Sequence, residues 1–211
     1  MLTAAATGQV DAGDRRANPE ARIGPNAIIR VAEALPGHVG PAAARAVFEA
    51  ADLAAYWERP PAGMVAEAEV TRLQQTLRDQ LGLEKARQVS WDAGLLTADY
   101  LLAVRIPKPA QRLLKPMPAR WASQVLLAAV KKNAWTFAGT GEFTAQGGRP
   151  SRVAIAGCCL CRGAEANVPL CDFYAASFER LFRVLVTPRA RAVEVACQAV
   201  GADACRFEID W

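Results

Sequence analysis

Apolar residues recur at intervals of three and four positions through the first two thirds of the chain, a spacing that predicts amphipathic helices. The clearest of these stripes, with polar side chains between its members, consists of Val70, Leu73, Leu77 and Leu81. Prolines and glycines separate the stripes, and Pro36-Gly37-His38 is expected to break the first helix. Helices are therefore predicted over residues 26–33, 41–53, 65–81, 84–104 and 119–133.

The hydrophobic period changes to two after residue 134. Trp135, Phe137 and Gly139 alternate with smaller or polar residues, which predicts a strand that continues to Thr144. A helix is expected over residues 171–186, and further strands over 152–157, 190–198 and 205–210. The predicted fold class is therefore α+β, with N-terminal helices followed by a β-β-α-β-β module whose antiparallel sheet is covered by helices.

Three parts are expected along the chain. Residues 1–20 lack an apolar core after a positive start, so they are expected to form a disordered arm rather than a secretory signal. Residues 21–133 form the helical part and residues 134–211 the α+β module. We expect residues 21–211 to fold as one compact unit, since a chain of this length buries most of its apolar surface.

Composition and charge exclude some functions. The 211 residues are 52% hydrophobic, and a net charge of +4 is too small to indicate a nucleic-acid-binding protein. No apolar run approaches the roughly 18 residues that cross a bilayer. We therefore expect a cytoplasmic protein, in which six cysteines serve as thiols or metal ligands rather than disulfides.

The cysteines give the most specific geometric prediction. If the last turn is centred on Gly201, Cys197 and Cys205 face each other across the terminal hairpin, with Cβ atoms about 4.5–5.5 Å apart. Cys171, at the start of the preceding helix, would be a third metal ligand with a lowered thiol pKa. A fourth zinc ligand would come from Cys158, Cys159 or Cys161. The alternative is a set of reduced cysteines that pack as small apolar side chains.

Other side chains suggest a binding surface for a flat anionic molecule. His38 is the sole histidine and could ligate the metal of a macrocycle, although a solvated loop histidine explains it as well. An aromatic pocket could include Trp91, Trp121 and Trp135, unless these tryptophans fill the core. The proline-broken basic run, with Arg105 and Arg112, could meet carboxylates, an acidic protein or a membrane, or be a solvated loop.

Familiar catalytic motifs are absent from the sequence. No G-x-G-x-x-G follows a strand, and neither a P-loop, G-x-S-x-G, H-E-x-x-H nor iron–sulfur spacing occurs. The sequence therefore offers no recognisable site for a hydride or electron donor.

The terminal run from Val193 to Ile209 resembles the 4-vinyl-reductase domain family. It has a strand bearing Glu194 and Cys197, a Gly-x-x-x-Cys turn and a final Phe-x-Ile strand, and Cys171 fits the family's upstream cysteine. This resemblance covers about residues 135–211. With the Ile23-Gly24-Pro25 opening and the proline-broken middle, the whole chain resembles a family of bacteriochlorophyll-synthesis proteins of purple photosynthetic bacteria.

The resemblance implies a fold shared with nitric-oxide-sensing haem domains and a Golgi-transport subunit, commonly with a hydrophobic small-molecule pocket. It also implies a structural zinc bound by Cys171, Cys197 and Cys205, for which we take Cys161 as the fourth ligand. The extra cysteines of the 158–161 cluster are a departure that leaves this fourth position open.

The resemblance further implies a place in the porphyrin branch of bacteriochlorophyll biosynthesis. We expect a protein that binds a Mg-porphyrin, either Mg-protoporphyrin or its ester, and carries it between pathway enzymes, because such macrocycles are apolar and need a shielded site. One alternative is reduction of the 8-vinyl group of a divinyl (proto)chlorophyllide. Another is a scaffold for the large subunit of Mg-chelatase and the Mg-protoporphyrin methyltransferase. A homodimer and a position at the photosynthetic membrane are further expectations.

Overall fold

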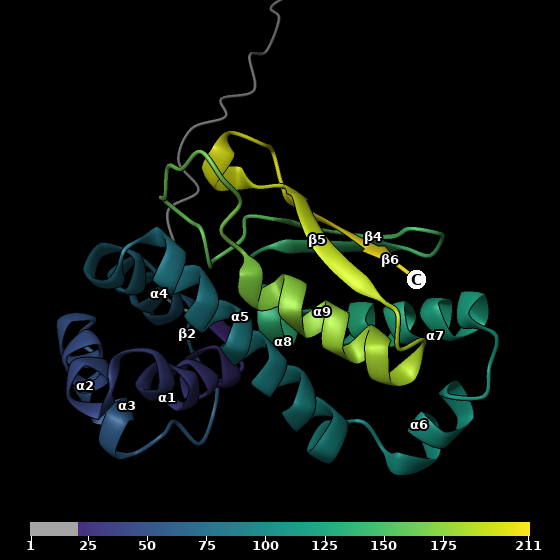
Figure 1. Ribbon diagram of the computed structural model, residues 1–211, viewed down its shortest axis with the longest axis horizontal. Helices are drawn as coiled ribbons and strands as arrows, with labels where there is room; N and C mark the ends of the chain where they lie inside the picture. The colour runs from purple at the N-terminus through teal and green to yellow at the C-terminus, as the bar shows by residue number, and fades with distance from the viewer. Residues whose placement is uncertain (1–20) are drawn as a thin grey trace, which may run out of the picture.

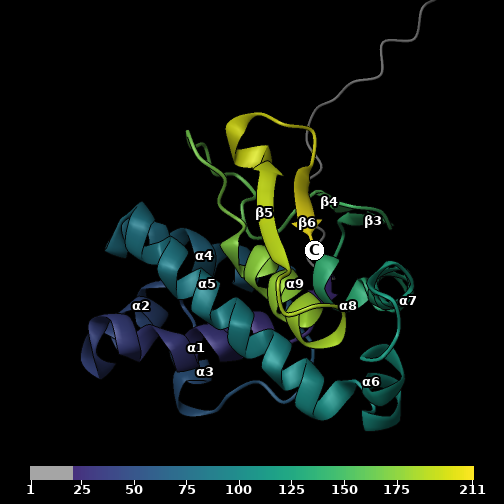
Figure 2. The ribbon, with the colours of Figure 1, turned by 45° about the vertical axis from the view of Figure 1, so that its right-hand side comes forward.

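The computed structural model of the protein describes residues 21–211 and confirms the α+β class (Figures 1 and 2). Helices occupy the N-terminal part and cover one face of an antiparallel sheet formed near the C-terminus. The predicted arm, residues 1–20, lies outside the described residues.

The N-terminal part is a layer of helices with a small strand pair. The strands β1 (Arg22–Ile23) and β2 (Val65–Ala66) pair antiparallel, so residue 65 belongs to a strand and not to the helix predicted there. The long predicted stripe is inward-facing in α4, where Val70, Leu73 and Leu77 are buried. The helices are α1 (Asn26–Val39), α2 (Pro41–Ala50), α3 (Ala54–Glu58), α4 (Glu67–Leu81) and α5 (Leu83–Tyr100).

The prediction that Pro36-Gly37-His38 breaks the first helix is wrong, because α1 continues to Val39. The last turn is closed by the Gly40 N–H, which donates to the Pro36 carbonyl at 2.9 Å. His38 is fixed from outside the helix, since its Nε2 lies 2.8 Å from Asp92 Oδ2 on α5. Tertiary contact thus compensates for the helix-breaking residues.

The middle of the chain contains more helix than the prolines suggested. The π-helix η1 (Leu101–Arg105) extends α5, and α6 (Lys108–Leu114) forms where only a stiff break was predicted. Then come α7 (Ala119–Lys132) and the short α8 (Trp135–Ala138). None of the described helices is long and apolar enough to cross a bilayer.

The strand predicted to begin at Trp135 is wrong over its first half. Trp135 and Phe137 lie in α8, and the strand begins only at Glu142. Residues two apart share a face in a strand but lie on nearly opposite faces of a helix. Accordingly Trp135 is exposed, while Phe137 packs against the aromatic core beside Phe143 and Tyr174.

The module after residue 140 has the predicted β-β-α-β-β order. Its strands are arranged β3-β4-β6-β5, all antiparallel. Phe143, Ile155 and Phe207 point from the inner face toward the helices, whereas the outer face is open to solvent. The elements are β3 (Glu142–Gln146), β4 (Ser151–Ala156), α9 (Asp172–Leu185), β5 (Arg191–Ala196), the 3-10 helix η2 (Gln198–Val200) and β6 (Cys205–Asp210).

The last hairpin has the predicted centre only near its turn. Ala196 pairs with Arg206, as a centre at Gly201 requires, but Glu194 pairs with Phe207. A β-bulge between Glu194 and Ala196 shifts the register by one residue. No feature of the alternating pattern indicates this extra residue.

Helices α5 and α9 join the two parts of the chain. Gly94 of α5 packs directly on α9, since a Cβ built there would lie 2.8 Å from the Ala176 Cβ and closer still to the Phe173 carbonyl. Ser177 Oγ donates to the Gly94 carbonyl at 3.0 Å. One buried apolar cluster then extends from Ile23 to Ile209, so residues 21–211 share a core.

Candidate metal centre and ligand groove

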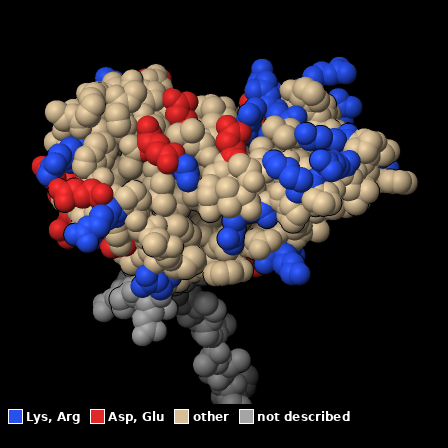
Figure 3. Space-filling model, turned by 90° about the horizontal axis from the view of Figure 1, so that it is seen from below, with Lys and Arg blue, Asp and Glu red and all other residues tan. Residues whose placement is uncertain are grey.

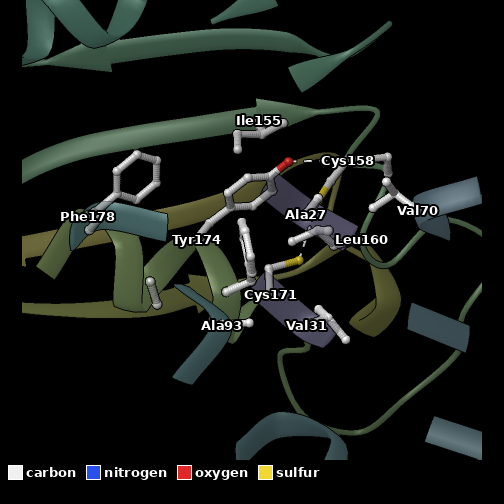
Figure 4. Close-up of a cluster of buried hydrophobic side chains, with 14 of the residues drawn as sticks. Ala27, Val31, Val70, Ala93, Ile155, Cys158, Leu160, Cys171, Tyr174 and Phe178 are labelled. Carbon is white, nitrogen blue, oxygen red and sulfur yellow. Dashed lines mark hydrogen bonds between the residues drawn. The ribbon is translucent and has the colours of Figure 1, made fainter. Parts of the chain in front are cut away.

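Five cysteines converge where the C-terminal hairpin meets the start of α9. Cys158 and Cys161 lie in the loop after β4, Cys171 is the residue that precedes α9, and Cys205 begins β6. Cys197 follows β5, and all five are buried with no disulfide among them. Figure 4 shows Cys158 and Cys171 in the buried cluster beside Tyr174.

The sulfur atoms lie at contact distance from one another. Sγ–Sγ separations are 3.5 Å for Cys158–Cys171, 3.4 Å for Cys161–Cys205 and 3.5 Å for Cys171–Cys205. These four sulfurs all lie within 4.8 Å of one another and could hold a metal ion. Cys197 Sγ is 3.8 Å from Cys205 Sγ, so the structure brings together the two cysteines that the hairpin arithmetic paired.

Two overlapping sets of four ligands are present. One consists of Cys158, Cys161, Cys171 and Cys205, and the other replaces the first two with Cys197 and Glu194. Tetrahedral zinc with Zn–S bonds of about 2.3 Å needs sulfurs about 3.8 Å apart. The observed spacings are close to that value, so the donor set fits zinc geometrically.

Hydrogen bonds divide the charge unevenly among the thiols. Those with Cys158 and Cys171 lower the pKa of Cys161, which becomes the preferred thiolate. The prediction that the helix start lowers the pKa of Cys171 is wrong among these neighbours, because hydrogen bonds with Cys158 and Cys161 raise it. The anionic charge that a metal would require therefore starts on the 158–161 loop.

Two charged residues beside the sulfurs were not predicted as part of the site. Glu194 Oε2 accepts the Cys171 N–H at 2.7 Å, while its Oε1 is buried without a partner among the described residues. Burial, followed by the nearby Cys197 charge, raises the pKa of Glu194 to about 9. Arg78 of α4 donates through Nη1 to the Leu160 carbonyl at 3.1 Å, and its buried Nη2 has no described partner.

Arg78 favours a negatively charged cluster. Burial lowers the pKa of Arg78, and charge on Cys161 and Cys171 acts in the opposite direction. A metal bound by four thiolates carries net negative charge, which would offset the cost of burying this guanidinium. The unpartnered Nη2 is therefore a second observation, besides the sulfur geometry, that fits an anionic metal site.

Some of these residues could have been found in the sequence. Glu194 occupies an inward position in an alternating strand, where a charged side chain is unusual. Arg78 gave no such signal, because it was assigned to the polar face of its helix. Cys159 lies apart from the four sulfurs, with its Sγ 3.8 Å from the Tyr174 hydroxyl.

A surface groove of about 460 Å³ lies beside the cysteine cluster, between α5, α9 and β5. Trp91 lines it together with two ion pairs of α9 residues, Arg87–Asp172 and Arg191–Glu179. Glu194 belongs to both the groove and the second ligand set. The groove and the metal centre therefore share a wall.

The six predicted ligand-binding residues do not meet in one pocket of the described structure. Only Trp91 lines the groove, whereas Arg105 and Arg112 are exposed on η1 and α6. Trp121 and Trp135 are 61% and 64% exposed, so they neither fill the core nor face Trp91's groove. The solvated-loop interpretation of His38 is wrong, because His38 is half-buried against Asp92.

Known proteins support a family assignment. The model of the vinyl-4-reductase (V-4-R) domain matches residues 151–210. Two relatives, both named bacteriochlorophyll synthase 23 kDa chain, come from Cereibacter sphaeroides and Rhodobacter capsulatus. The first is 44% identical over 89% of this chain and 90% of its own length, and the second 38% identical over 89% and 86%.

A solved structure shares the fold. An Fe(II) H-NOX protein variant from K. algicida aligns with a TM-score of 0.59 over 89% of this chain and 96% of its own, at 10% identity. That identity is low enough that the likeness concerns the fold alone. By its identity to the two long relatives, the chain belongs to the family of the bacteriochlorophyll synthase 23 kDa chain and carries a vinyl-4-reductase domain.

Proposed function

We propose that this protein acts in bacteriochlorophyll biosynthesis by binding a Mg-porphyrin intermediate, Mg-protoporphyrin or its ester, and carrying it between pathway enzymes. The place in the pathway rests on the two relatives, whose names assign them to bacteriochlorophyll synthesis. The binding role rests on the groove between α5, α9 and β5.

The groove offers what a porphyrin edge needs. Trp91 provides a flat apolar surface for stacking on the macrocycle. Arg87 and Arg191 provide cations for the carboxylate groups of the pigment. Asp172 engages Nε and Nη2 of Arg87 at 2.9 and 3.0 Å, which orients the guanidinium and leaves its Nη1 available.

The cysteine cluster would hold a structural zinc. Cys158, Cys161, Cys171 and Cys205 are the ligands best placed for it, and Cys197 and Glu194 form the alternative half. Zinc supplies four strong bonds that connect the 158–161 loop, the start of α9 and the start of β6. Those bonds would keep the groove walls at Asp172 and Glu194 in place.

Absorbance titration of the purified protein with Mg-protoporphyrin tests the proposal. We expect a saturable spectral shift at micromolar protein. Trp91→Ala should weaken binding by about tenfold, because an aromatic contact with the pigment is removed. Trp121→Ala is the matched control, since Trp121 is exposed on α7 outside the groove.

Two results would contradict the carrier role. One is the absence of any saturable shift, and the other is an equal loss of affinity in the Trp91 and Trp121 variants. Incubation with a divinyl (proto)chlorophyllide and NADPH covers the reductase alternative, because monovinyl product would show that the groove serves chemistry rather than transport. Co-purification with Mg-chelatase and the methyltransferase, with and without pigment, covers the scaffold alternative.

A further inference from the structure

The segment from residue 100 to residue 141 differs in charge from the rest of the chain. It contains seven basic residues and no acidic one. The whole chain has 25 Lys and Arg against 21 Asp and Glu, so the remaining residues comprise 18 basic and 21 acidic ones and are net negative. The seven basic residues are Arg105, Lys108, Arg112, Lys115, Arg120, Lys131 and Lys132.

These seven cations are available for binding. All are exposed on η1, α6, α7 and the loop between the last two. Within residues 21–211, every ion pair joins residues outside this set. Figure 3 shows Lys and Arg gathered at the end of the molecule where Figure 1 places α6 and α7.

The same segment exposes large apolar side chains. Val104, Leu113, Trp121 and Trp135 are each more than 60% exposed, and Val125 is 48% exposed. Solvated surfaces seldom place tryptophans and cations together without a ligand, because exposed apolar area is costly. In membrane-bound segments, by contrast, tryptophan lies at the lipid–water boundary and cations meet the headgroups.

Helix α7 shows this arrangement most clearly. Its inner face is buried through Ala122, Leu126 and Leu127. Trp121 and Val125 are one helical turn apart and form an outward apolar row. The exposed Arg120, Lys131 and Lys132 occupy the two ends of the same helix. The outer row can therefore enter the headgroup region of a bilayer while the inner row stays in the core.

We propose that the basic face, formed by η1, α6 and α7, docks the protein on an anionic lipid bilayer. Charge complementarity selects the surface, since cations without acidic neighbours are attracted to a negative leaflet. Trp121, Leu113 and Val125 give shallow apolar insertion, which one charged protein partner would not require. This docking is independent of what the groove between α5, α9 and β5 binds.

Flotation of the full chain with lipid vesicles tests the docking. We expect binding to phosphatidylcholine vesicles containing about 30 mol% phosphatidylglycerol, and little binding to phosphatidylcholine alone. Lys131→Glu combined with Lys132→Glu should reduce the apparent affinity at least about tenfold. Trp121→Ala should reduce it several-fold. Binding should also weaken as salt rises.

The matched control changes the charge by the same amount elsewhere. Arg59→Glu combined with Lys85→Glu replaces two exposed cations of the N-terminal helical part and should leave vesicle binding within about twofold of the parent. Equal losses in the two double variants, or equal binding to neutral and anionic vesicles, would overturn the proposal. Binding to polyglutamate through Lys131 and Lys132, with no vesicle binding, would overturn it in favour of an acidic protein partner.

Discussion

At the scale of single residues, the cysteine cluster is an electrostatic problem with a metal as its simplest solution. Thiols are weak hydrogen-bonding groups, yet they are gathered around the buried side chains of Arg78 and Glu194. A guanidinium without a described partner for Nη2 is costly to bury unless charge of opposite sign lies nearby. Thiolates on a divalent metal would supply that charge.

The metal centre predicts a clear difference between two cysteine variants. Cys171→Ser removes a sulfur common to both ligand sets, so we expect metal content to fall from about one zinc per chain to near zero. Cys159→Ser should retain the metal, because Cys159 faces the Tyr174 hydroxyl instead. Elemental analysis of tag-free protein measures both. Equal metal content in the parent and the Cys171 variant would contradict the site.

At the scale of elements, the contact between α5 and α9 is the main joint of the fold. The helices approach so closely at Gly94 that backbone and Cβ atoms of Phe173 and Ala176 occupy the space of a side chain. Ser177 adds a hydrogen bond to the Gly94 carbonyl. Because Asp172 starts α9 and Trp91 lies on α5, this joint also sets the width of the groove.

Two glycine substitutions should have opposite effects on stability. Gly94→Ala should lower the free energy of unfolding by about 1–3 kcal/mol, because the helices must separate to admit a methyl group. Gly37→Ala, in α1 with nothing within 4 Å of the added Cβ, should raise it by about 0.5–1 kcal/mol. Urea denaturation followed by circular dichroism measures both. A neutral Gly94→Ala would show that the joint relaxes without cost.

Periodicity predicted the elements whose burial is local and missed those fixed by distant contacts. Val70, Leu73 and Leu77 placed α4 correctly, and glycine placed the last turn. The continuation of α1 through Pro36 depends on Asp92, more than fifty residues away, and the helical turn at Trp135 cannot be distinguished from a strand by a two-residue repeat. Within the site, the cysteines were visible in the sequence, whereas the role of Arg78 depends on how α4 packs.

At the scale of the whole molecule, one core and two chemically different ends are present. The buried cluster runs through both the helical part and the module. The basic face of η1, α6 and α7 lies at one end, while the groove and the metal centre lie between α5, α9 and the C-terminal hairpin. A pigment in the groove would thus be held by surfaces other than those that meet a membrane.

A shared core predicts cooperative unfolding. Heating should give a single transition that coincides when followed by far-ultraviolet circular dichroism and by tryptophan fluorescence, because Trp57 and Trp91 pack against the same core as the sheet. Removal of metal with a chelator should move this whole transition to lower temperature. Separate transitions for helices and sheet would contradict the prediction and divide the chain near residue 134.

The crowding of sulfurs also makes the protein sensitive to oxidation. Cys171 and Cys205 have sulfurs 3.5 Å apart, and a disulfide requires only that they approach to about 2.05 Å. Loss of two electrons and two protons would then join the start of α9 to β6 covalently and remove two donors common to both ligand sets. A bound metal would protect these thiolates, so protein that has lost its metal in air should become unable to take it up again until a reductant restores the thiols.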